Sequence, residues 1–462
     1  MPVFRTHPTR PLPLTTPRRR ACAVAGTMLA ATAVTSACAP GAAAPQQATS
    51  SAISTSVPTD KVSLTIAHFE SGGGGTAIDK LISAYEQKHP NVTIKAAYTS
   101  FNDYGKSIKL SMSSDSAPDI AEVGQAYTMQ GPLVKAGLLR PLDAYAKAYG
   151  WDTRFQTGLL NQSRFQPDGK SFGAGNLYGL ALGGNMVGIY YNKKAIAQLG
   201  ITVPFKDVAD FNAALAKVKG AGQVPIELGN SEQWPGNHVL SSLIAQYAPL
   251  DQQVAWVYGK KGASFASAGV IQATTTMSTW ARNGYFDPAA NGTSNDDAVA
   301  RFAKGTGAFF ISGNWTLASI EEKMGKNAGF TPVPPVTAGA PARATGATTS
   351  PFGISSKSKH ADVAANFIDF MTRPEAAQTL SAGGYAPVAP GAATAAASPL
   401  QQDFNAAWSK VLTDDGLCLY LDWATTSMGD TLFPGVQELL GDKTTPDKLV
   451  TAVQADWVKA HG

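Results

Sequence analysis

From residue 61 onward, the sequence alternates the pattern of a buried strand with the pattern of an amphipathic helix. Residues 62–66 alternate apolar and polar side chains, and residues 78–85 repeat apolar side chains at helical spacing. His89-Pro90 ends that helix, residues 92–94 alternate again, a second helix is predicted over about 102–114, and a further strand opens at 118–120. This β-α-β-α-β order predicts an α/β fold, with a parallel sheet covered by helices on both faces.

The first 37 residues have the pattern of an export signal. Arg18, Arg19 and Arg20 precede a 17-residue uncharged stretch at 21–37, which ends in small residues. The stretch is shorter than the ~20 apolar residues that a membrane-spanning helix needs. We therefore expect residues 1–37 to be a signal peptide and the protein to be exported. Both the general secretory route and the twin-arginine route stay open.

Cys38 follows this signal directly and resembles the lipid-modified cysteine of a bacterial lipobox, although Thr35 stands where the pattern usually has Leu. The resemblance implies acylation and attachment to the outer face of the cytoplasmic membrane. A plainly cleaved, secreted protein is the alternative. Residues 39–59 are uncharged and rich in Ala, Pro, Ser and Thr, so we predict that 38–60 comprises the lipidated cysteine and a flexible tether.

Charge and cysteine content exclude several function classes. The net charge of +4 does not indicate a nucleic-acid partner, because residues 1–37 contain five arginines and no acid. Of three cysteines, Cys22 would leave with the signal and Cys38 would carry lipid, so no disulfide framework or zinc site can form. Cys418 is predicted to be buried and inert. We expect neither a metal nor a cofactor.

A run of glycines at 72–75 lies between the first predicted strand and the first predicted helix. Such a loop can hold a phosphate at a helix N-terminus, but no Lys-Ser or Lys-Thr follows it and the spacing differs from that of a dinucleotide fold. The alternative is that the glycines let a ligand or a second lobe approach the end of the strand closely, where open α/β sheets bind ligands.

Short motifs spread over residues 61–462 carry a family resemblance. They are HPNV at 89–92, APDI at 117–120, GLLRPLD at 137–143, LYGL at 177–180, YYNK at 190–193, FAKGTGA at 302–308, GNW at 313–315, AANF at 364–367 and GGYAP at 383–387. In this order the chain resembles the extracellular solute-binding proteins of family 1, the carbohydrate-binding, maltose-binding-protein-like receptors of ABC importers. The segment 421–428 is similar to members that bind raffinose-type or other α-linked oligosaccharides.

The resemblance implies a two-lobe, periplasmic-binding-protein-like fold of type II, in which each lobe is a sheet flanked by helices and the ligand lies in a cleft between the lobes. Residues 61–180 plus 330–373 would form lobe 1, and residues 181–329 plus 374–462 would form lobe 2. The protein would be a monomer that is not an enzyme, and would deliver a sugar to a membrane permease driven by an ATPase. Closure on the ligand would be a hinge motion.

Sugar binding needs aromatic faces that cover pyranose rings and polar groups that bind hydroxyls. Trp315 follows a predicted strand, Trp234 lies in a second loop, and Tyr385 follows two glycines. For these residues ordinary core packing is the alternative. Asp422 is the preferred polar group, with a solvated loop acid as the alternative.

Further polar candidates lie at or just beyond predicted strand ends, where Glu70, Glu122 and Gln125 would face the cleft. His68 ends the first strand, and a structural histidine is the alternative there. Two acidic pairs, at 296–297 and 414–415, are expected at helix starts. The predicted ligand-binding residues are His68, Phe69, Glu70, Glu122, Gln125, Asn185, Asn230, Trp234, Trp315, Gly384, Tyr385, Asp422 and Trp423.

Two other function classes remain as alternatives. One is a binding lipoprotein for a non-sugar solute such as a peptide, a polyamine or glycerol phosphate. The other is a secreted glycosidase, which would need two carboxyl groups set about 5–9.5 Å apart across a cleft. No hydrolase motif is present in the sequence, and we predict no catalytic residue.

Overall fold

The computed structural model describes residues 53–388 and 398–462, so Cys38 and the predicted signal peptide lie outside the described residues. The first sheet has the strand order β2-β1-β3-β12-β6. Its members are β2 (Val92–Tyr98), β1 (Val62–His68), β3 (Ile120–Glu122), β12 (Pro351–Ile354) and β6 (Leu180–Ala181). β1 pairs parallel with β2 and β3, whereas β12 pairs antiparallel with β3 and β6.

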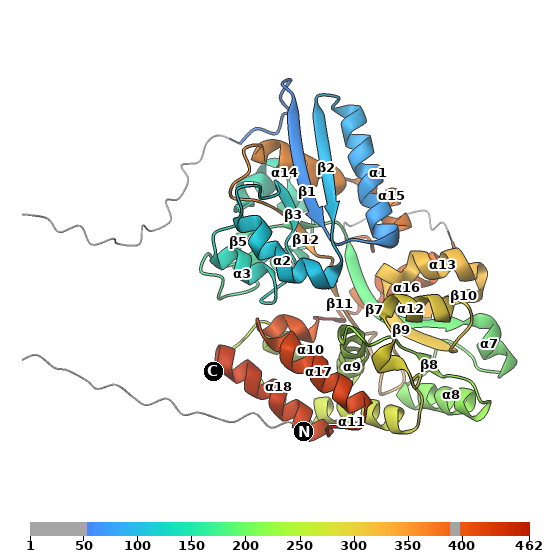
Figure 1. Cartoon of the computed structure of the whole chain (residues 1–462). Helices are drawn as coiled ribbons and strands as arrows, with labels where there is room; N and C mark the ends of the chain where they lie inside the picture. The colour runs from blue at the N-terminus through green and yellow to red at the C-terminus, as the bar shows by residue number, and fades with distance from the viewer. Residues whose placement is uncertain (1–52, 389–397) are drawn as a thin grey trace, which may run out of the picture. The chain divides into compact units, whose positions relative to one another are not determined.

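The predicted β-α-β-α-β order is confirmed by β1, α1 (Gly72–Lys88), β2, α2 (Phe101–Ser113) and β3. His89 caps the end of α1, as the His-Pro pair predicts. The apolar side chains of α1 share a core with the inward residues of β1, while Tyr104 and Ile108 of α2 belong to another core. Figure 1 shows the two helices on opposite sides of β1 and β2.

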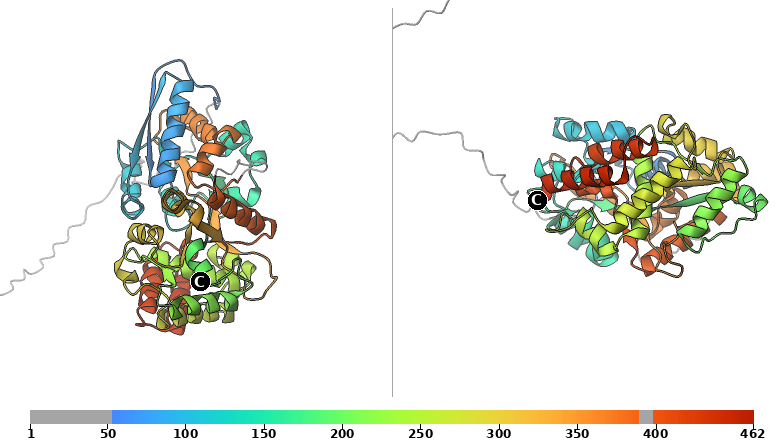
Figure 2. Two further views of the ribbon diagram at one scale, coloured as in Figure 1. Left: turned by 90° about the vertical axis from the view of Figure 1, so that its right-hand side faces the viewer. Right: turned by 90° about the horizontal axis from the view of Figure 1, so that it is seen from below.

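The second sheet has the order β13-β11-β7-β9-β8, and β10 also pairs with β7. Its strands are β13 (Leu417–Cys418), β11 (Ala344–Thr348), β7 (Gly184–Asn192), β9 (Phe309–Gly313), β8 (Ile226–Glu227) and β10 (Ala328–Thr331). The helices packed around it include α9 (Trp234–Tyr247), α11 (Ala268–Arg282), α17 (Met428–Leu440) and α18 (Pro446–His461). Figure 2 shows α17 and α18, in red, side by side.

Within the described residues, three segments pass between the two sheets. Residues 182–183 join β6 to β7, residues 349–350 join β11 to β12, and residues 383–388 follow α15 (Ala377–Ala382), which packs on α1. The Thr349 N–H donates to the Gly183 carbonyl at 2.8 Å, so two of the crossings touch, and Ala386 forms a bridge with Gly184 at the start of β7. The site is built around these crossings.

The lobe boundaries stay a prediction, but strand pairing corrects two parts of them. Residues 344–348 were expected in lobe 1, yet β11 pairs with β7 and β13 of the second sheet, because the chain returns to the first sheet only after residue 348. Helix α15 was expected in lobe 2, yet it packs on α1.

The end of the predicted tether also differs from the expectation. The Ser54 N–H donates to Asp362 at 3.2 Å, and Asn366 donates to the carbonyl of Thr55 at 3.0 Å. Ile53 and Val57 pack against the core of the first sheet. Burial of these two apolar side chains explains why residues 53–60 lie on the folded protein rather than forming part of a free tether.

The remaining elements complete the two halves. They are α3 (Gln130–Lys135), α4 (Asp143–Tyr149), α5 (Trp151–Arg154), α6 (Thr157–Asn161), β4 (Arg164–Phe165), β5 (Asn176–Leu177), α7 (Lys193–Gln198), α8 (Val208–Gly220), α10 (Leu250–Val257), η1 (Ala290–Gly292), α12 (Asn295–Ala303), η2 (Asn314–Thr316), α13 (Leu317–Met324), η3 (Gly325–Asn327), α14 (Ala361–Met371), η4 (Pro374–Ala376), α16 (Pro399–Thr413) and η5 (Leu421–Ala424).

Three smaller predictions have mixed outcomes. Asp296 and Asp297 lie in the first turn of α12, as expected. The prediction for 414–415 is wrong, because Asp414 ends α16 and is held there by Lys410 and the Ala342 N–H. Cys418 is buried as predicted, and burial raises the pKa of its thiol to about 12.

Among the helices of 53–388 and 398–462, none has the length and apolar character needed to cross a membrane.

Candidate functional site

Two glutamates meet where β1 and β3 end. Because these strands run parallel, their carboxyl ends lie at the same edge of the sheet. Glu122, the last residue of β3, is 0% exposed, and its Oε2 accepts the N–H of Phe69 at 2.9 Å. Tyr104 of α2 donates to the backbone carbonyl of Glu122 at 2.7 Å. The sheet and α2 together therefore fix this carboxyl group inside the protein.

Glu70 lies two residues before α1, next to the N-cap Ser71, and its carboxyl group lies over the first turn of that helix. A Cβ atom at Gly74 would come within 2.5 Å of Glu70 Oε2 and 3.4 Å of the Tyr385 hydroxyl. Only glycine leaves room for this approach. The glycine run therefore serves the second of the two roles considered for it, close approach, and brings Glu70 and Tyr385 together above the helix N-terminus.

Burial controls the ionisation of this acid pair. It raises the pKa of Glu122 well above its ordinary value, and the neighbouring charge of Glu70 raises it further. Burial also raises the pKa of Glu70, while hydrogen bonds from Tyr385 and Glu122 act in the opposite direction. Burial and the two carboxyl groups hold the pKa of Tyr385 well above its ordinary value. The arrangement favours a shared proton between Glu70 and Glu122.

His68 and Phe69 line the same end of β1. His68 is 4% exposed, its Nδ1 has no hydrogen-bond partner, and burial lowers its pKa, so the ring is neutral. The Phe69 ring packs edge-on against Phe101 at 5.1 Å and Tyr104 at 5.2 Å, which anchors it to α2. Phe69 therefore lies beside the acid pair, with its N–H bound to Glu122 and its ring packed on α2.

A second group of side chains gathers at the second sheet, and aromatic rings dominate it. Trp234 is the first residue of α9 and Trp315 follows β9 in η2; their ring centroids lie 6.2 Å apart, edge to face. His238 lies one helical turn after Trp234, with centroids 5.1 Å from Trp234, 5.2 Å from Trp315 and 5.3 Å from Tyr420. We call these four residues the aromatic group.

Sequence reasoning missed His238 and Tyr420. Burial lowers the pKa of His238 to about 3, so its ring is neutral. Its Nδ1 and the Nε1 of Trp315 are both enclosed without a hydrogen-bond partner. The available signal was the spacing of four residues between Trp234 and His238, which places both on one helix face.

Polar side chains adjoin the aromatic group. Asp422, in η5, accepts from the side chain of Asn237 at 3.2 Å, and burial raises its pKa to about 6. The backbone carbonyl of Asp422 accepts from the Thr128 hydroxyl at 2.7 Å, and Thr128 lies in the loop between β3 and α3. The Tyr420 hydroxyl donates to Asn185 Oδ1 at 2.8 Å. Asp422 therefore belongs to a polar cluster between the halves rather than to a solvated loop.

Some predicted residues are occupied by structural contacts. Asn230 Oδ1 accepts the Gly236 N–H at 2.7 Å, and its amide donates to Asn291 at 2.9 Å. The carbonyl of Gly384, whose φ is 94°, accepts from Asn314 at 2.5 Å.

Trp423 and Gln125 are also held by the scaffold. Trp423 is 4% exposed and packs on Tyr420 and Phe172. Gln125 reaches the Thr348 carbonyl at 3.5 Å. These contacts favour supporting roles for all four residues, and their place in a binding site stays a prediction.

The crossing segments connect the acid pair to the aromatic group. Tyr385 precedes Ala386, which bridges to Gly184, and the next residue, Asn185, accepts from Tyr420. Asn314, beside Trp315, donates to the carbonyls of Gly184 and Gly384. Both groups therefore flank the same crossing, and their enclosed polar atoms without partners include His68 Nδ1, Glu122 Oε1, His238 Nδ1 and Trp315 Nε1. Such atoms are costly unless a ligand satisfies them.

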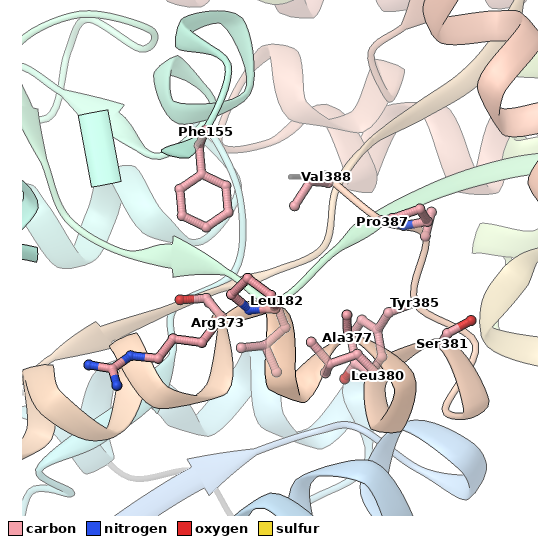
Figure 3. Close-up of a pocket in the computed structure, with 12 residues that line it drawn as sticks. Phe155, Leu182, Arg373, Ala377, Leu380, Ser381, Tyr385, Pro387 and Val388 are labelled. Carbon is pink, nitrogen blue, oxygen red and sulfur yellow. The ribbon is translucent and has the colours of Figure 1, made fainter. Parts of the chain in front are cut away.

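Two nearby cavities differ in size. Figure 3 shows the smaller, about 30 Å³, which is lined by Phe155, Leu182 and Leu380 together with the Tyr385 ring. It has room for about one water molecule. The larger, about 310 Å³, lies between α1, α13 and α15 and is lined mainly by small residues. Neither cavity combines the acid pair with the aromatic group.

The side chains of the acid pair and of the aromatic group can recognise a polar solute that has flat apolar faces. Aromatic rings can cover the C–H faces of a sugar, and neutral imidazoles, an indole N–H and carboxyl groups can bind hydroxyls. In the part of the chain that the structure describes, no group of three or more His, Cys, Asp or Glu side chains could hold a metal ion.

Comparison with known proteins supports a binding role. Residues 70–378 match the family described as bacterial extracellular solute-binding protein. A multiple sugar-binding protein of Streptococcus mutans serotype c is 26% identical over 318 residues, which cover 65% of this chain and 69% of that protein.

Solved structures agree with the fold. A chitin oligosaccharide binding protein superimposes with a TM-score of 0.75 at 25% identity, covering 87% of this chain and 99% of its own. A solute-binding protein in complex with raffinose superimposes with a TM-score of 0.70 at 21% identity, covering 87% and 100%. The predicted two-lobe α/β class is confirmed by this likeness.

Proposed function

The chain belongs to the family of bacterial extracellular solute-binding proteins, and we propose that it captures a sugar, in particular an oligosaccharide, for an ABC importer. The observation that carries this proposal is the aromatic group, in which Trp234, Trp315 and His238 lie beside buried polar atoms at the crossing between two sheets. A sugar presents both apolar faces and hydroxyl groups, so it matches both features. The relatives whose names refer to sugars support the same choice.

The protein would bind its ligand without cleaving it. A glycosidase needs two carboxyl groups about 5–9.5 Å apart, so that a sugar carbon fits between them. Glu70 and Glu122 are instead hydrogen-bonded to each other. That contact leaves no space for a reacting centre, which argues against hydrolysis by this pair.

Export, anchoring and partners follow from the same proposal. A receptor of this kind passes its ligand to a membrane permease that an ATPase drives. We place the protein outside the cytoplasmic membrane, held there by lipid on Cys38, as a monomer. Residues 182–183, 349–350 and 383–388 would act as the hinge between the lobes.

A ligand panel tests the proposal. Purified protein is melted in the presence of oligosaccharides, short peptides, polyamines and glycerol phosphate, since a ligand that binds only the folded state raises the melting temperature. We expect an oligosaccharide to give the largest shift and to be recovered intact after incubation. A larger shift with a peptide or polyamine would refute the sugar assignment, and release of shorter sugars would refute the non-enzymatic one.

A further inference from the structure

Two exposed aromatic side chains lie beside the candidate site. In the part of the chain that the structure describes, the exposed large apolar side chains include only two aromatic ones, Tyr98 at the end of β2 and Phe101 at the start of α2. We propose that these two rings form an outer subsite, which holds the far end of a longer oligosaccharide. This inference rests on the proposed function and deepens it, because it assigns the ligand a length of more than two sugar units.

Strand order and ring contacts connect the two rings to the acid pair. β2, β1 and β3 are neighbouring parallel strands that end at one edge of the first sheet, in Tyr98, His68 and Glu122. The Tyr98 ring lies 6.1 Å from the His68 ring, between centroids. The Phe101 ring packs at 5.1 Å on that of Phe69, whose N–H donates to Glu122. Phe101 is therefore one side chain away from the acid pair.

Exposure gives a ligand access to both rings. Tyr98 is 56% exposed and Phe101 is 48% exposed, whereas Trp234 and Trp315 of the aromatic group are partly buried. A sugar can reach the two exposed rings from solvent, without a cavity and without movement of the fold. Covering these rings with the C–H face of a sugar removes apolar surface from water, which is favourable.

The residues around the rings fit a sugar better than a protein partner. Ser100 and Asn102 are exposed between and beside the rings, and a hydroxyl or an amide can bind sugar hydroxyls. Asp103 and Lys106 follow on α2, with side chains 71% and 79% exposed. A stable protein interface covers about 800 Å² of each partner around a core depleted of charge. Two rings bordered by charged side chains are too small a patch for that.

The spacing of the strands sets the minimum length of the ligand. β2 lies two strand positions from β3, which is about 10 Å at the usual spacing and farther than one sugar unit extends. A sugar chain that contacts the aromatic group, the acid pair and the outer rings therefore needs at least one unit at each. A disaccharide is too short to occupy all three.

Oligosaccharides of two lengths test the subsite. Maltose, chitobiose and melibiose, and the tetrasaccharides maltotetraose, chitotetraose and stachyose, are titrated calorimetrically into the mature protein. We expect at least one tetrasaccharide to bind about tenfold more tightly than the disaccharide of its series, in line with the size of a stacking contact on an aromatic side chain.

Variants assign this gain to the two rings. Tyr98→Ala and Phe101→Ala should each weaken binding of that tetrasaccharide about threefold or more, and the double variant should bind it only as tightly as the disaccharide. Tyr98→Phe should keep wild-type affinity, because the ring face remains. Leu110→Ala is the matched control: Leu110 is 76% exposed on the same helix, about two and a half turns after Phe101 and thus on the opposite side. It should change neither affinity.

The outcomes separate the two proposals. If disaccharides bind and no tetrasaccharide binds more tightly, or if the double variant keeps the full gain with length, the outer subsite is overturned and the sugar-binding function stands. If none of the six sugars binds, this inference is overturned, and the proposed function fails with it when a peptide or a polyamine binds instead. Urea melts of the same variants should match wild type, because both rings are exposed.

Discussion

Replacing Trp315 by alanine separates a ligand-binding tryptophan from a core tryptophan. The Trp315 ring is only partly buried, contacts Trp234 and His238, and its Nε1 has no hydrogen-bond partner to lose. Stacking on a sugar is worth about 1–3 kcal/mol by analogy with nucleic-acid bases stacked on aromatic side chains, so the variant should bind about tenfold to a hundredfold more weakly. Its free energy of unfolding should fall by about 1–2 kcal/mol, well short of a buried tryptophan.

Trp423 provides the matched control. It is 4% exposed and packed on Phe172 and Tyr420, so Trp423→Ala should cost about 3–5 kcal/mol of stability through the cavity that it leaves. Calorimetric titration with the best ligand from the panel measures affinity, and urea melts of the same proteins measure stability. Large destabilisation of Trp315→Ala with unchanged affinity would refute the reasoning and return Trp315 to the core.

Gly313 offers a variant that moves the ring without removing it. A Cβ atom at this position would overlap the six-membered ring of Trp315, which therefore lies directly on the glycine. Gly313 has ordinary extended backbone angles, so alanine strains the ring position rather than the chain. Gly313→Ala should weaken binding at least tenfold, in the same direction as Trp315→Ala. Wild-type affinity in this variant would show that the ring position does not matter.

Three further outcomes are expected. Burial raises the pKa of Glu122, so its protonated form stabilises the fold at low pH, and this stability is lost as pH rises through the folded-state pKa. In urea melts, Glu122→Gln should therefore lose less stability than wild type between pH 5 and pH 9. Parallel plots of stability against pH for the two proteins would contradict the shared proton. A Cβ atom at Gly73 would lie 2.7 Å from Ala318 of α13, so Gly73→Leu should keep α1 and α13 apart, weaken binding and enlarge the ligand-bound radius of gyration in small-angle scattering. Gly158→Leu is the control and should have none of these effects, because nothing lies within 4 Å of a Cβ atom there. Equal scattering curves for the two variants would count against a closing contact between α1 and α13. Cys38→Ser should move the protein from the membrane fraction to the medium, and retention in high salt would mean that another anchor exists.

Local sequence patterns predict an export signal, and they determined the order of strands and helices up to residue 122. Alternation and helical spacing are local properties, so the strands β1 to β3 and the helices between them could be read from the sequence. Because parallel strands end at one edge, Glu70 and Glu122 could also be expected near each other. The resemblance, carried by short motifs in order, added the two-lobe class.

Only the tertiary structure decided which side chains meet. Tyr385 reaches Glu70 across more than 300 residues of chain, and it does so because α15 packs on α1, a contact that no local pattern encodes. His238 and Tyr420 lie in the candidate site because α9 packs beside η2 and η5. Asn230 instead binds the backbone at the start of α9, and Trp423 is buried in a core. The sequence limits which residues can bind a sugar, whereas long-range packing selects which of them converge, because convergence depends on contacts between distant segments.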